Sequence, residues 1–288
     1  MTVSVDANQV RQDQQGEWTA AAPGWTRYVD EIRRPAQPIT ARLIEYAGIR
    51  RGQHVLDLAC GVGDPALSIA RLVGPEGSVL GVDVTTAMVE GARAHAEAEE
   101  LTNARFRTID SELEPGVPDA AFDAVTCRHG LMYMPDPSAA VAAWVKALKP
   151  GGRLAVSSWG SPDQVPFFTT ALGILARHIE LPPPDPSAPG PFALPSTERL
   201  RDVLQSAGMV DVETAAFDTP VYEAESAAEW WDLLSATGGP LVMLLASLPP
   251  SKREEIREDA IKTATELFPA GPVSLGGRAL VAGGVKPA

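Results

Sequence analysis

Short apolar runs rich in β-branched residues alternate with alanine-rich segments through the first half of the chain. Runs of this length between turn residues are typical of strands buried on both faces, and the intervening segments have helical spacing. The expected strands cover residues 55–58, 78–82, 104–108, 121–127 and 152–157. The expected helices cover residues 65–73, 87–99 and 138–148, the last followed by a stop and turn at residues 149–152. This alternation predicts a doubly wound α/β core of parallel strands.

The N-terminal flank of this core has a different pattern. A polar leader precedes residues 24–48, whose apolar positions have loosely helical spacing. Pro35 and Pro38 interrupt that spacing and should divide the stretch into two helices. We therefore expect a small helical flap in front of the first strand.

The C-terminal flank begins with a proline-rich stretch, residues 181–195, that cannot form a regular element. A helix over residues 197–207 and a strand over residues 210–219 then resume the α/β pattern. Helical spacing continues through residues 224–268, with breaks at 238–240 and 249–250. Residues 278–285 are expected to form a closing strand, and Gly276-Gly277 before them suit a hairpin-like turn with the 210–219 strand.

The end of the first predicted strand carries a glycine turn, Asp57-Leu-Ala-Cys-Gly61-Val-Gly63-Asp64-Pro65. Gly61 and Gly63 allow the backbone to approach a ligand where a Cβ would collide. Asp64 can cap the following helix, and Pro65 suits its first position because proline has no N–H to lose there. A glycine pair alone also occurs in tight turns that only serve packing.

An acidic residue ends the second predicted strand and strengthens the ligand interpretation. Asp83 lies 20 residues beyond Gly63, and its carboxylate can accept hydrogen bonds from both ribose hydroxyls of a nucleoside. The alternative is that Asp83 only caps the helix that starts near Thr86. Asp110 and Ser111 end the third strand, where a carboxylate and a hydroxyl can contact an adenine ring.

Together these motifs resemble the class I S-adenosylmethionine-dependent methyltransferases, in particular the branch of the ubiquinone and menaquinone C-methyltransferases and many natural-product methyltransferases. The resemblance covers about residues 28–212 and includes residues 148–154 as the turn into the fifth strand. It implies a seven-strand, mostly parallel sheet with the last strand antiparallel, and helical lid insertions. Ala59 departs from the broader class, which often has glycine there. The positions that we expect to bind S-adenosylmethionine, on the motifs, the resemblance and the flap together, are Tyr28, Asp57, Ala59, Gly61, Gly63, Asp83, Val84, Met88, Asp110, Ser111 and Arg128.

The resemblance divides the chain into five parts with separate tasks. Residues 51–160 are expected to form the S-adenosylmethionine-binding core. The other parts are an N-terminal helical flap (1–50), an acceptor-side insertion with the sixth strand (161–222), a helical lid (223–272) and the closing strand (273–288).

Two other functions use similar sequence features. A nicotinamide-dependent oxidoreductase would have the same turn and a similarly placed acid, but the third glycine of its fingerprint is missing. Asp64 also places a negative charge beside the helix N-terminus, where a pyrophosphate would bind. The second alternative is a relative that binds S-adenosylmethionine without methylating, as a cyclase or a binding protein.

The residues that follow the fourth predicted strand, 127–133, should line the reactive end of the site. His129 is the candidate catalytic residue, because imidazole can remove a proton from an acceptor. It could instead pack on the cofactor or bind its carboxylate. The candidate acceptor-binding residues are Trp25, Tyr133, His178 and Trp231. The apolar stretch around Trp231 fits a lid over an aromatic or quinone-like acceptor, a helix packed on the core, or a homodimer interface.

Composition narrows the class of acceptor. The formal net charge of −13 would repel a phosphate backbone, so we expect a small molecule and no nucleic acid. No apolar stretch approaches the length of a membrane span, and the N-terminal residues lack the apolar core of a secretion signal, so we expect a cytoplasmic protein without a membrane partner. Cys60 and Cys127 lack metal-site spacing, so we expect buried thiols and no metal. Whether oxygen, nitrogen or carbon accepts the methyl group stays open.

Overall fold

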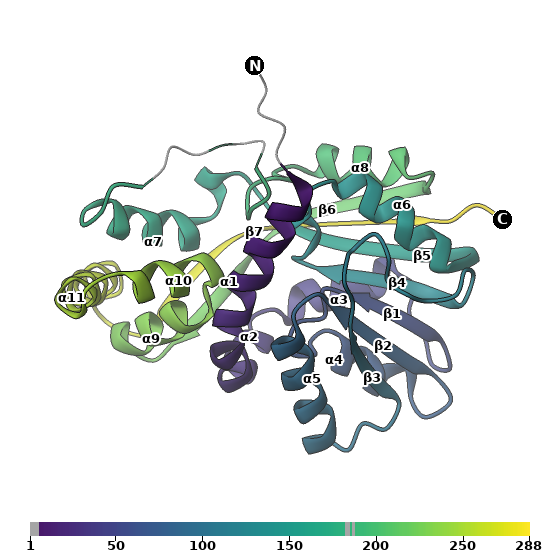
Figure 1. Cartoon of the computed structure of the whole chain (residues 1–288), viewed down its shortest axis with the longest axis horizontal. Helices are drawn as coiled ribbons and strands as arrows, with labels where there is room; N and C mark the ends of the chain where they lie inside the picture. The colour runs from purple at the N-terminus through teal and green to yellow at the C-terminus, as the bar shows by residue number, and fades with distance from the viewer. Residues whose placement is uncertain (1–5, 182–184, 186–187) are drawn as a thin grey trace.

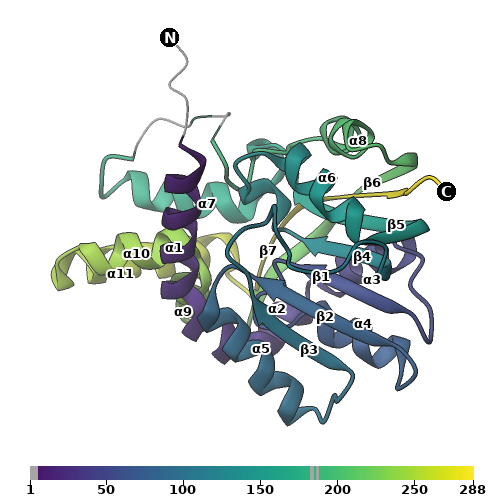
Figure 2. The same cartoon turned by 45° about the vertical axis from the view of Figure 1, so that its right-hand side comes forward.

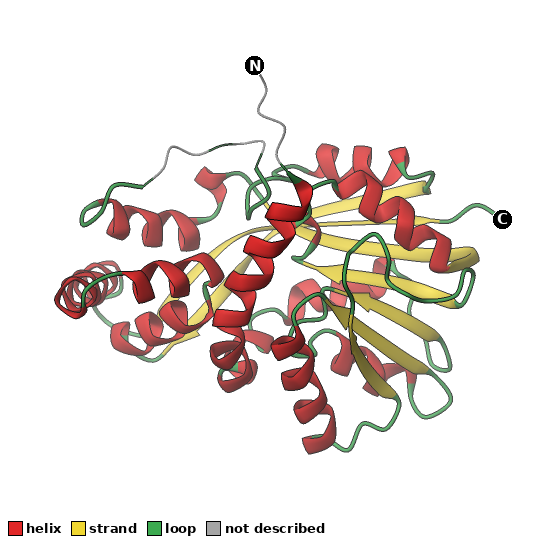
Figure 3. Cartoon of the chain, viewed as in Figure 1, coloured by secondary structure: helices red, strands yellow, loops and turns green. Residues whose placement is uncertain are grey.

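A computed structural model describes residues 6–181, 185 and 188–288, and its centre is a seven-stranded sheet in the order β3-β2-β1-β4-β5-β7-β6 (Figures 1 and 3). The first five strands pair in parallel, whereas β7 is antiparallel to both β5 and β6. The predicted fold class is therefore confirmed. The strands are β1 (His54–Leu58), β2 (Ser78–Asp83), β3 (Ala104–Thr108), β4 (Phe122–Arg128), β5 (Leu148–Trp159), β6 (Val210–Ala224) and β7 (Val273–Val285).

Helices cover both faces of this sheet. On one face, α3 (Gln37–Tyr46) and α4 (Ala66–Val73) pack against the strands, and on the other lie α6 (Pro137–Ala147) and α8 (Thr197–Ser206) (Figure 1). Two neighbouring glycines of β7 show the two layers, because a Cβ on Gly283 would meet Tyr46 of α3 and one on Gly284 would meet Met209 after α8. Both layers bury apolar side chains, which explains the apolar runs of the central strands, whereas the edge strand β3 keeps Arg105 and Arg107 exposed.

The remaining helices lie at one end of the sheet or beside β3. They are α1 (Ala7–Arg27), α2 (Val29–Arg33), α5 (Thr86–Ala98), α7 (Pro166–Ala176), α9 (Ala227–Thr237), α10 (Gly239–Ser247) and α11 (Pro250–Leu267), with single turns η1 (Leu131–Tyr133) and η2 (Pro162–Gln164). Helices α7, α9, α10 and α11 form a cap at one end of the sheet, where α7 packs against β7 and α9 against β6 (Figure 1). Among the described helices, none combines the length and the apolar content that crossing a bilayer requires.

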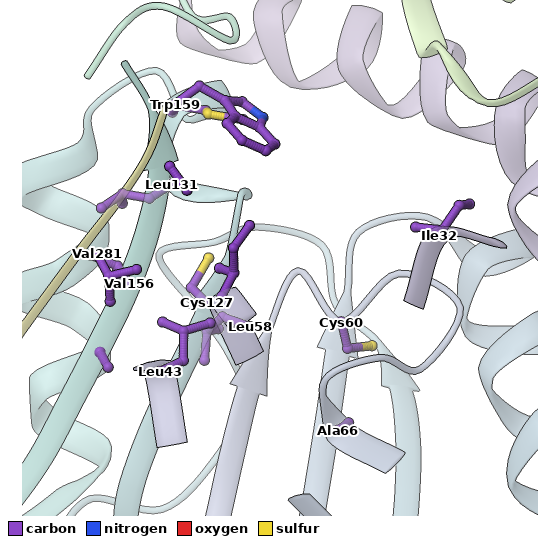
Figure 4. Packing of buried hydrophobic residues seen from close by; sticks show 14 of the residues in the cluster. Ile32, Leu43, Leu58, Cys60, Ala66, Cys127, Leu131, Val156, Trp159 and Val281 are labelled. Atoms are coloured by element: carbon purple, nitrogen blue, oxygen red, sulfur yellow. The ribbon is translucent and has the colours of Figure 1, made fainter. Parts of the chain in front are cut away.

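One large apolar core joins the sheet to its helices. Figure 4 shows part of it, in which Leu43 of α3, Leu58 of β1 and Val156 of β5 gather between the layers. Cys60 and Cys127 are both buried there, as predicted. A second, smaller cluster, composed of Ala22, Val62 and Met88, joins α1 to the glycine turn and α5.

The polar stretch before residue 24 is helical, because residues 7–27 form the long helix α1, whose start the apolar spacing did not indicate. Asp6 caps this helix by accepting the N–H of Asn8 at 2.9 Å. Most of its side chains are polar and only Ala21, Ala22 and Gly24 are buried, so the apolar pattern was too weak to predict it. A Cβ on Gly24 would collide with Ala236, so a small residue lets α1 approach α9 closely.

Two predicted turns are wrong. Gly276 and Gly277 lie inside β7, paired with Pro220 and Thr219 of a β6 that is longer than predicted. A Cβ on Gly276 would collide with the Thr219 carbonyl, so the glycine serves close strand contact and not a reversal. Residues 149–152 likewise belong to β5, and a register shift between Phe122 and Ala124 accommodates them.

Candidate active site

The carboxyl ends of β1, β2 and β4 meet where the strand order of the sheet reverses. In open parallel sheets, this switch point is where ligands bind. The glycine turn follows β1, Asp83 ends β2, and Arg128 and His129 follow β4. The sequence therefore placed these residues on the correct edge of the sheet.

The glycine turn has an unusual backbone. Ala59, Gly61 and Gly63 have positive φ angles of 53°, 51° and 109°. A Cβ on Gly61 would meet nothing within 4 Å, so this stretch of backbone is open to a ligand. A Cβ on Gly63 would lie 3.0 Å from Leu67, so Gly63 serves the packing of α4. Of the two glycines, only Gly61 has the open space that ligand contact needs.

The carboxylate of Asp83 ties this turn to β2. One oxygen accepts the N–H of Gly61 at 3.0 Å and the other accepts the N–H of Thr85 at 2.9 Å. Burial raises the pKa of Asp83, and these backbone hydrogen bonds oppose the rise. Each carboxylate oxygen can accept a second hydrogen bond, so Asp83 can hold the turn and ribose hydroxyls together. Thr85 is the N-cap of α5, so Asp83 is not the capping residue of that helix.

Asp57 is fully buried beneath the turn, with one oxygen unpaired. Its Oδ1 accepts the hydroxyl of Thr126 at 2.6 Å, while Oδ2 has no hydrogen-bond partner among the described residues. Burial raises the pKa of Asp57 to about 7, although the Thr126 hydrogen bond opposes this. A buried acceptor without a partner costs roughly 1–3 kcal/mol. Asp57 therefore fits a ligand that brings a donor, such as an ammonium group.

The raised pKa of Asp57 predicts a pH-dependent stability. Between the ordinary carboxyl pKa and about 7, the folded chain keeps a proton that the unfolded chain has released, so this group lowers stability as pH rises. Below its ordinary pKa, His129 makes stability rise with pH, because its pKa is lowered in the folded chain. The contributions of Asp57 and His129 to the pH dependence must therefore be separated by mutation. Asp57→Asn should be more stable than the wild type by roughly 2–4 kcal/mol at pH 8 and by much less at pH 5.

Urea unfolding at both pH values measures this difference. Asp123→Asn is the matched control, because burial of Asp123 is outweighed by the His54 N–H and the Lys149 ammonium, which together lower its pKa. That variant should lose a similar amount of stability relative to the wild type at pH 5 and at pH 8, because both values lie above the ordinary carboxyl pKa. An Asp57→Asn advantage of equal size at pH 5 and pH 8 would show that Asp57 ionises normally.

Arg128 forms a buried ion pair with Asp64 at the start of α4. Its guanidinium also donates to the carbonyl of Asp64 at 3.1 Å and to the hydroxyl of Thr40 at 3.0 Å. Ser68 donates to the same Asp64 carboxylate at 2.8 Å. The prediction that Asp64 caps α4 is wrong, because Pro65 is the N-cap and no side chain caps this end. Arg128 thus holds β4, the glycine turn and α3 together.

His129 stacks on Trp159 at the end of β5, with ring centroids 4.2 Å apart and planes 7° from parallel. Its backbone has a φ of 55°, and its N–H donates to Ser157 at 3.0 Å. Neither ring nitrogen has a hydrogen-bond partner among the described residues. Burial and the nearby Arg128 charge lower the pKa of His129 to about 3. The imidazole is therefore neutral at pH 7 and is a weak base, although it can still form hydrogen bonds.

Aromatic side chains gather beyond His129, on the side of the cap. Tyr133 packs edge-on against Trp18 of α1 at 5.3 Å, and Trp18 in turn packs against Trp25 at 6.1 Å. Trp25 donates its indole N–H to the Thr237 carbonyl at 2.7 Å. The predicted residues Trp25 and Tyr133 thus lie in one cluster. A second series of ring contacts starts at His129 and includes Trp159, Phe167, Phe168, Phe192 and Tyr222.

Helix α1 crosses the carboxyl ends of β2 and β3 (Figures 1 and 2). Arg11 binds the carboxylate of Glu112 with two hydrogen bonds of 2.7 and 2.8 Å. Gln15 donates to the carbonyl of Val84 at 2.8 Å. Met88 packs in the small cluster with Ala22 of α1. The sequence indicated a flap, but not that this earlier helix covers the predicted nucleoside side of the site.

Several predicted residues have local partners or lie apart from this cluster. His178 binds Asp259 of α11 at 2.8 Å, so it links α7 to α11. Trp231 is buried in α9, and Tyr28 ends α1 with Arg27 over its ring. Asp110 is exposed, and the hydroxyl of Ser111 accepts the N–H of Leu113 at 3.1 Å. The structure gives His178 a role in holding the cap together.

Comparisons with known proteins identify the family. A methyltransferase domain family model matches residues 49–180. The ubiquinone/menaquinone biosynthesis C-methyltransferase UbiE of Serratia proteamaculans (strain 568) is 32% identical over 179 residues, which are 59% of this chain and 71% of that protein. The aklanonic acid methyltransferase DauC of Streptomyces sp. (strain C5) is 35% identical over 121 residues, 42% of this chain and 54% of that protein. The chain belongs to this family of S-adenosylmethionine-dependent methyltransferases.

Solved structures share the fold. The YcgJ protein from Bacillus subtilis superimposes with a TM-score of 0.56 at 22% identity, over 86% of this chain and 98% of that one. The [4+2]-cyclase SpnF superimposes with a TM-score of 0.53 at 21% identity, over 88% of this chain and 81% of that one.

The chain spans about half the length of several curated relatives that it matches. One is UbiE from Teredinibacter turnerae, which is 39% identical over 121 residues, 42% of this chain and 48% of that protein.

Proposed function

We propose that the protein transfers a methyl group from S-adenosylmethionine to a small aromatic or apolar acceptor, such as a quinone-like compound or a secondary metabolite. The observation that carries this proposal is the junction of an open glycine turn, Asp83 and Asp57 at the carboxyl ends of β1 and β2. The names of the relatives UbiE and DauC support a quinone-like or secondary-metabolite acceptor.

The residues around the turn fit a cationic cofactor without phosphate. Asp57, Asp64 and Asp83 surround it, and the nearby Arg128 is engaged by Asp64. A pyrophosphate would face these carboxylates, whereas the Asp57 oxygen without a partner could accept from an ammonium group. When bound, S-adenosylmethionine supplies an electrophilic methyl group. The protein has to align the acceptor with that methyl group and exclude water.

The aromatic cluster suits a planar acceptor. Trp159 and Phe168 contact each other edge-on, and Trp18 and Tyr133 do so on the side of α1. Rings at these angles offer apolar surfaces and ring edges, which favour the packing of another aromatic molecule. The net charge of −13 further favours a small acceptor over a nucleic acid.

Binding and product analysis test this function together. We expect calorimetry to show S-adenosylmethionine binding, and mass spectrometry to show a gain of about 14 Da on a member of a panel of hydroxynaphthoquinols and hydroxyanthraquinones, as methyl transfer requires. A [4+2]-cyclase such as SpnF shares this fold. Binding of S-adenosylmethionine with rearranged products of unchanged mass would therefore favour the cyclase alternative and contradict methyl transfer.

A further inference from the structure

Glu17 of α1 places a carboxylate beside the aromatic cluster. Its Oε2 atom is buried and has no hydrogen-bond partner among the described residues. The next residue, Trp18, packs against Tyr133, and the charge of Glu17 adds to burial in raising the pKa of Tyr133. Glu17 is therefore a half-buried acid with one buried, unpartnered oxygen on the acceptor side of the site.

The surroundings of Glu17 favour its protonated form more than water would. Burial raises the pKa of Glu17, and the neighbouring Asp13 raises it further. On α10, Gly239 lies against it, since a Cβ there would come within 3.6 Å of the Glu17 Cβ. Helix α10 carries no ionisable side chain, and the group that faces Glu17 from η1 is the Tyr133 phenol. No cation among the described residues pairs with Glu17.

Methyl transfer to a hydroxyl needs a group that takes its proton. Efficient general bases have a pKa near the working pH. His129 has a pKa of about 3 and lacks a partner that would hold its imidazolium form. Asp57 also has an oxygen without a partner, but it lies fully buried beneath the cofactor turn, and Asp83 is bound to the backbone of that turn. On the acceptor side, these assignments leave Glu17 as the free carboxylate.

We propose that Glu17 is the general base of the reaction and that the acceptor carries a phenolic or enolic hydroxyl, an inference that rests on the proposed methyltransferase function. The proton of the acceptor hydroxyl moves to Oε2 of Glu17 while a lone pair of the acceptor oxygen forms the bond to the methyl carbon. The electron pair of the broken carbon–sulfur bond stays on sulfur. Glu17 later returns its proton to solvent.

A different role for Glu17 makes different predictions. The Cβ of Glu17 lies near Gly239 at the N-terminus of α10, where a negative charge stabilises a helix. If that were its task, Glu17→Gln would lower the thermal midpoint and leave turnover per folded molecule unchanged. If Glu17 is the general base, Glu17→Gln should instead lower turnover per folded molecule and leave the thermal midpoint unchanged. Gln keeps the shape of the side chain but cannot take a proton.

The experiment compares Glu17→Gln with Asp13→Asn, one turn earlier on the same helix, using the hydroxyanthraquinone and hydroxynaphthoquinol panel. We expect Glu17→Gln to lower kcat at least ~100-fold with the affinity for S-adenosylmethionine changed less than ~3-fold. It should also remove the fall in kcat at low pH that protonation of Glu17 causes. Asp13→Asn should keep the wild-type maximum kcat and shift that fall to lower pH, because it removes a charge that raises the pKa of Glu17.

A second measurement needs no acceptor. The carboxyl carbon of Glu17, assigned in NMR spectra by its loss in Glu17→Gln, should titrate above the ordinary glutamate range and move down in Asp13→Asn. An ordinary titration, or an unchanged kcat in Glu17→Gln, overturns the proposal. Failure of the wild type to methylate any hydroxyl acceptor contradicts the proposed function instead, and it is seen before any variant is made.

Discussion

Replacing Asp83 by alanine should lower the affinity for S-adenosylmethionine by about 100-fold or more. A hydrogen bond to a charged group contributes roughly 1.5–3 kcal/mol, and the carboxylate is expected to accept from two ribose hydroxyls. The substitution also removes the acceptor for the N–H groups of Gly61 and Thr85. The glycine turn would then be less firmly held to β2, which adds to the loss.

Calorimetry below the unfolding midpoint of each variant measures this effect. Asp83→Asn should bind S-adenosylmethionine with an affinity between those of the wild type and Asp83→Ala, because its amide oxygen can still accept one of these hydrogen bonds. Asp119→Ala is the control, since Asp119 is an exposed carboxylate in the loop before β4 and should leave binding unchanged. Binding by Asp83→Ala within threefold of the wild type would remove Asp83 from the cofactor site.

The sheet and the cofactor side of the site could be predicted because both depend on local sequence. Buried parallel strands are apolar along their whole length, and the end of each strand fixes where its polar residues lie. Asp57, Asp83 and His129 therefore fell on the same sheet edge without any knowledge of tertiary contacts. The meaning of single residues was harder to predict. Asp64 could cap a helix or bind Arg128, and only the fold brings Arg128 within reach.

The residues that close the site could not be predicted, because their partners are distant in sequence. Arg11 and Glu112 are 101 positions apart, and each alone resembles an exposed charge. Helix α1 itself is polar and stays in place through contacts with α5, α9 and α10. Trp159 had a usable signal, since it ends β5 beside the end of β4. Glu17 had none, because its importance comes from burial against another helix.

Arg128→Ala should destabilise the protein by roughly 3–5 kcal/mol, since removing one partner of a buried ion pair leaves the other charge uncompensated. The side chains of Arg128 and Asp64 are only 7% and 3% exposed, so water cannot replace the lost partner. Ser68 would remain as a single donor to the Asp64 carboxylate. The substitution also cuts the link from β4 to Thr40, so α3 should loosen along with the glycine turn.

Urea unfolding tests this prediction with a matched pair of variants. Arg278→Ala removes an ion pair to Asp218 on the exposed part of β6 and β7, where solvent screens the charges, so its unfolding midpoint should barely change. The double variant Arg128→Met with Asp64→Asn should recover much of the stability lost in Arg128→Ala, because no buried charge is left alone. If the double variant is no more stable than Arg128→Ala, the cost lies in lost packing and not in an unpaired carboxylate. Recovery of stability without recovery of S-adenosylmethionine affinity would show that the ion pair positions the turn as well as stabilising the fold.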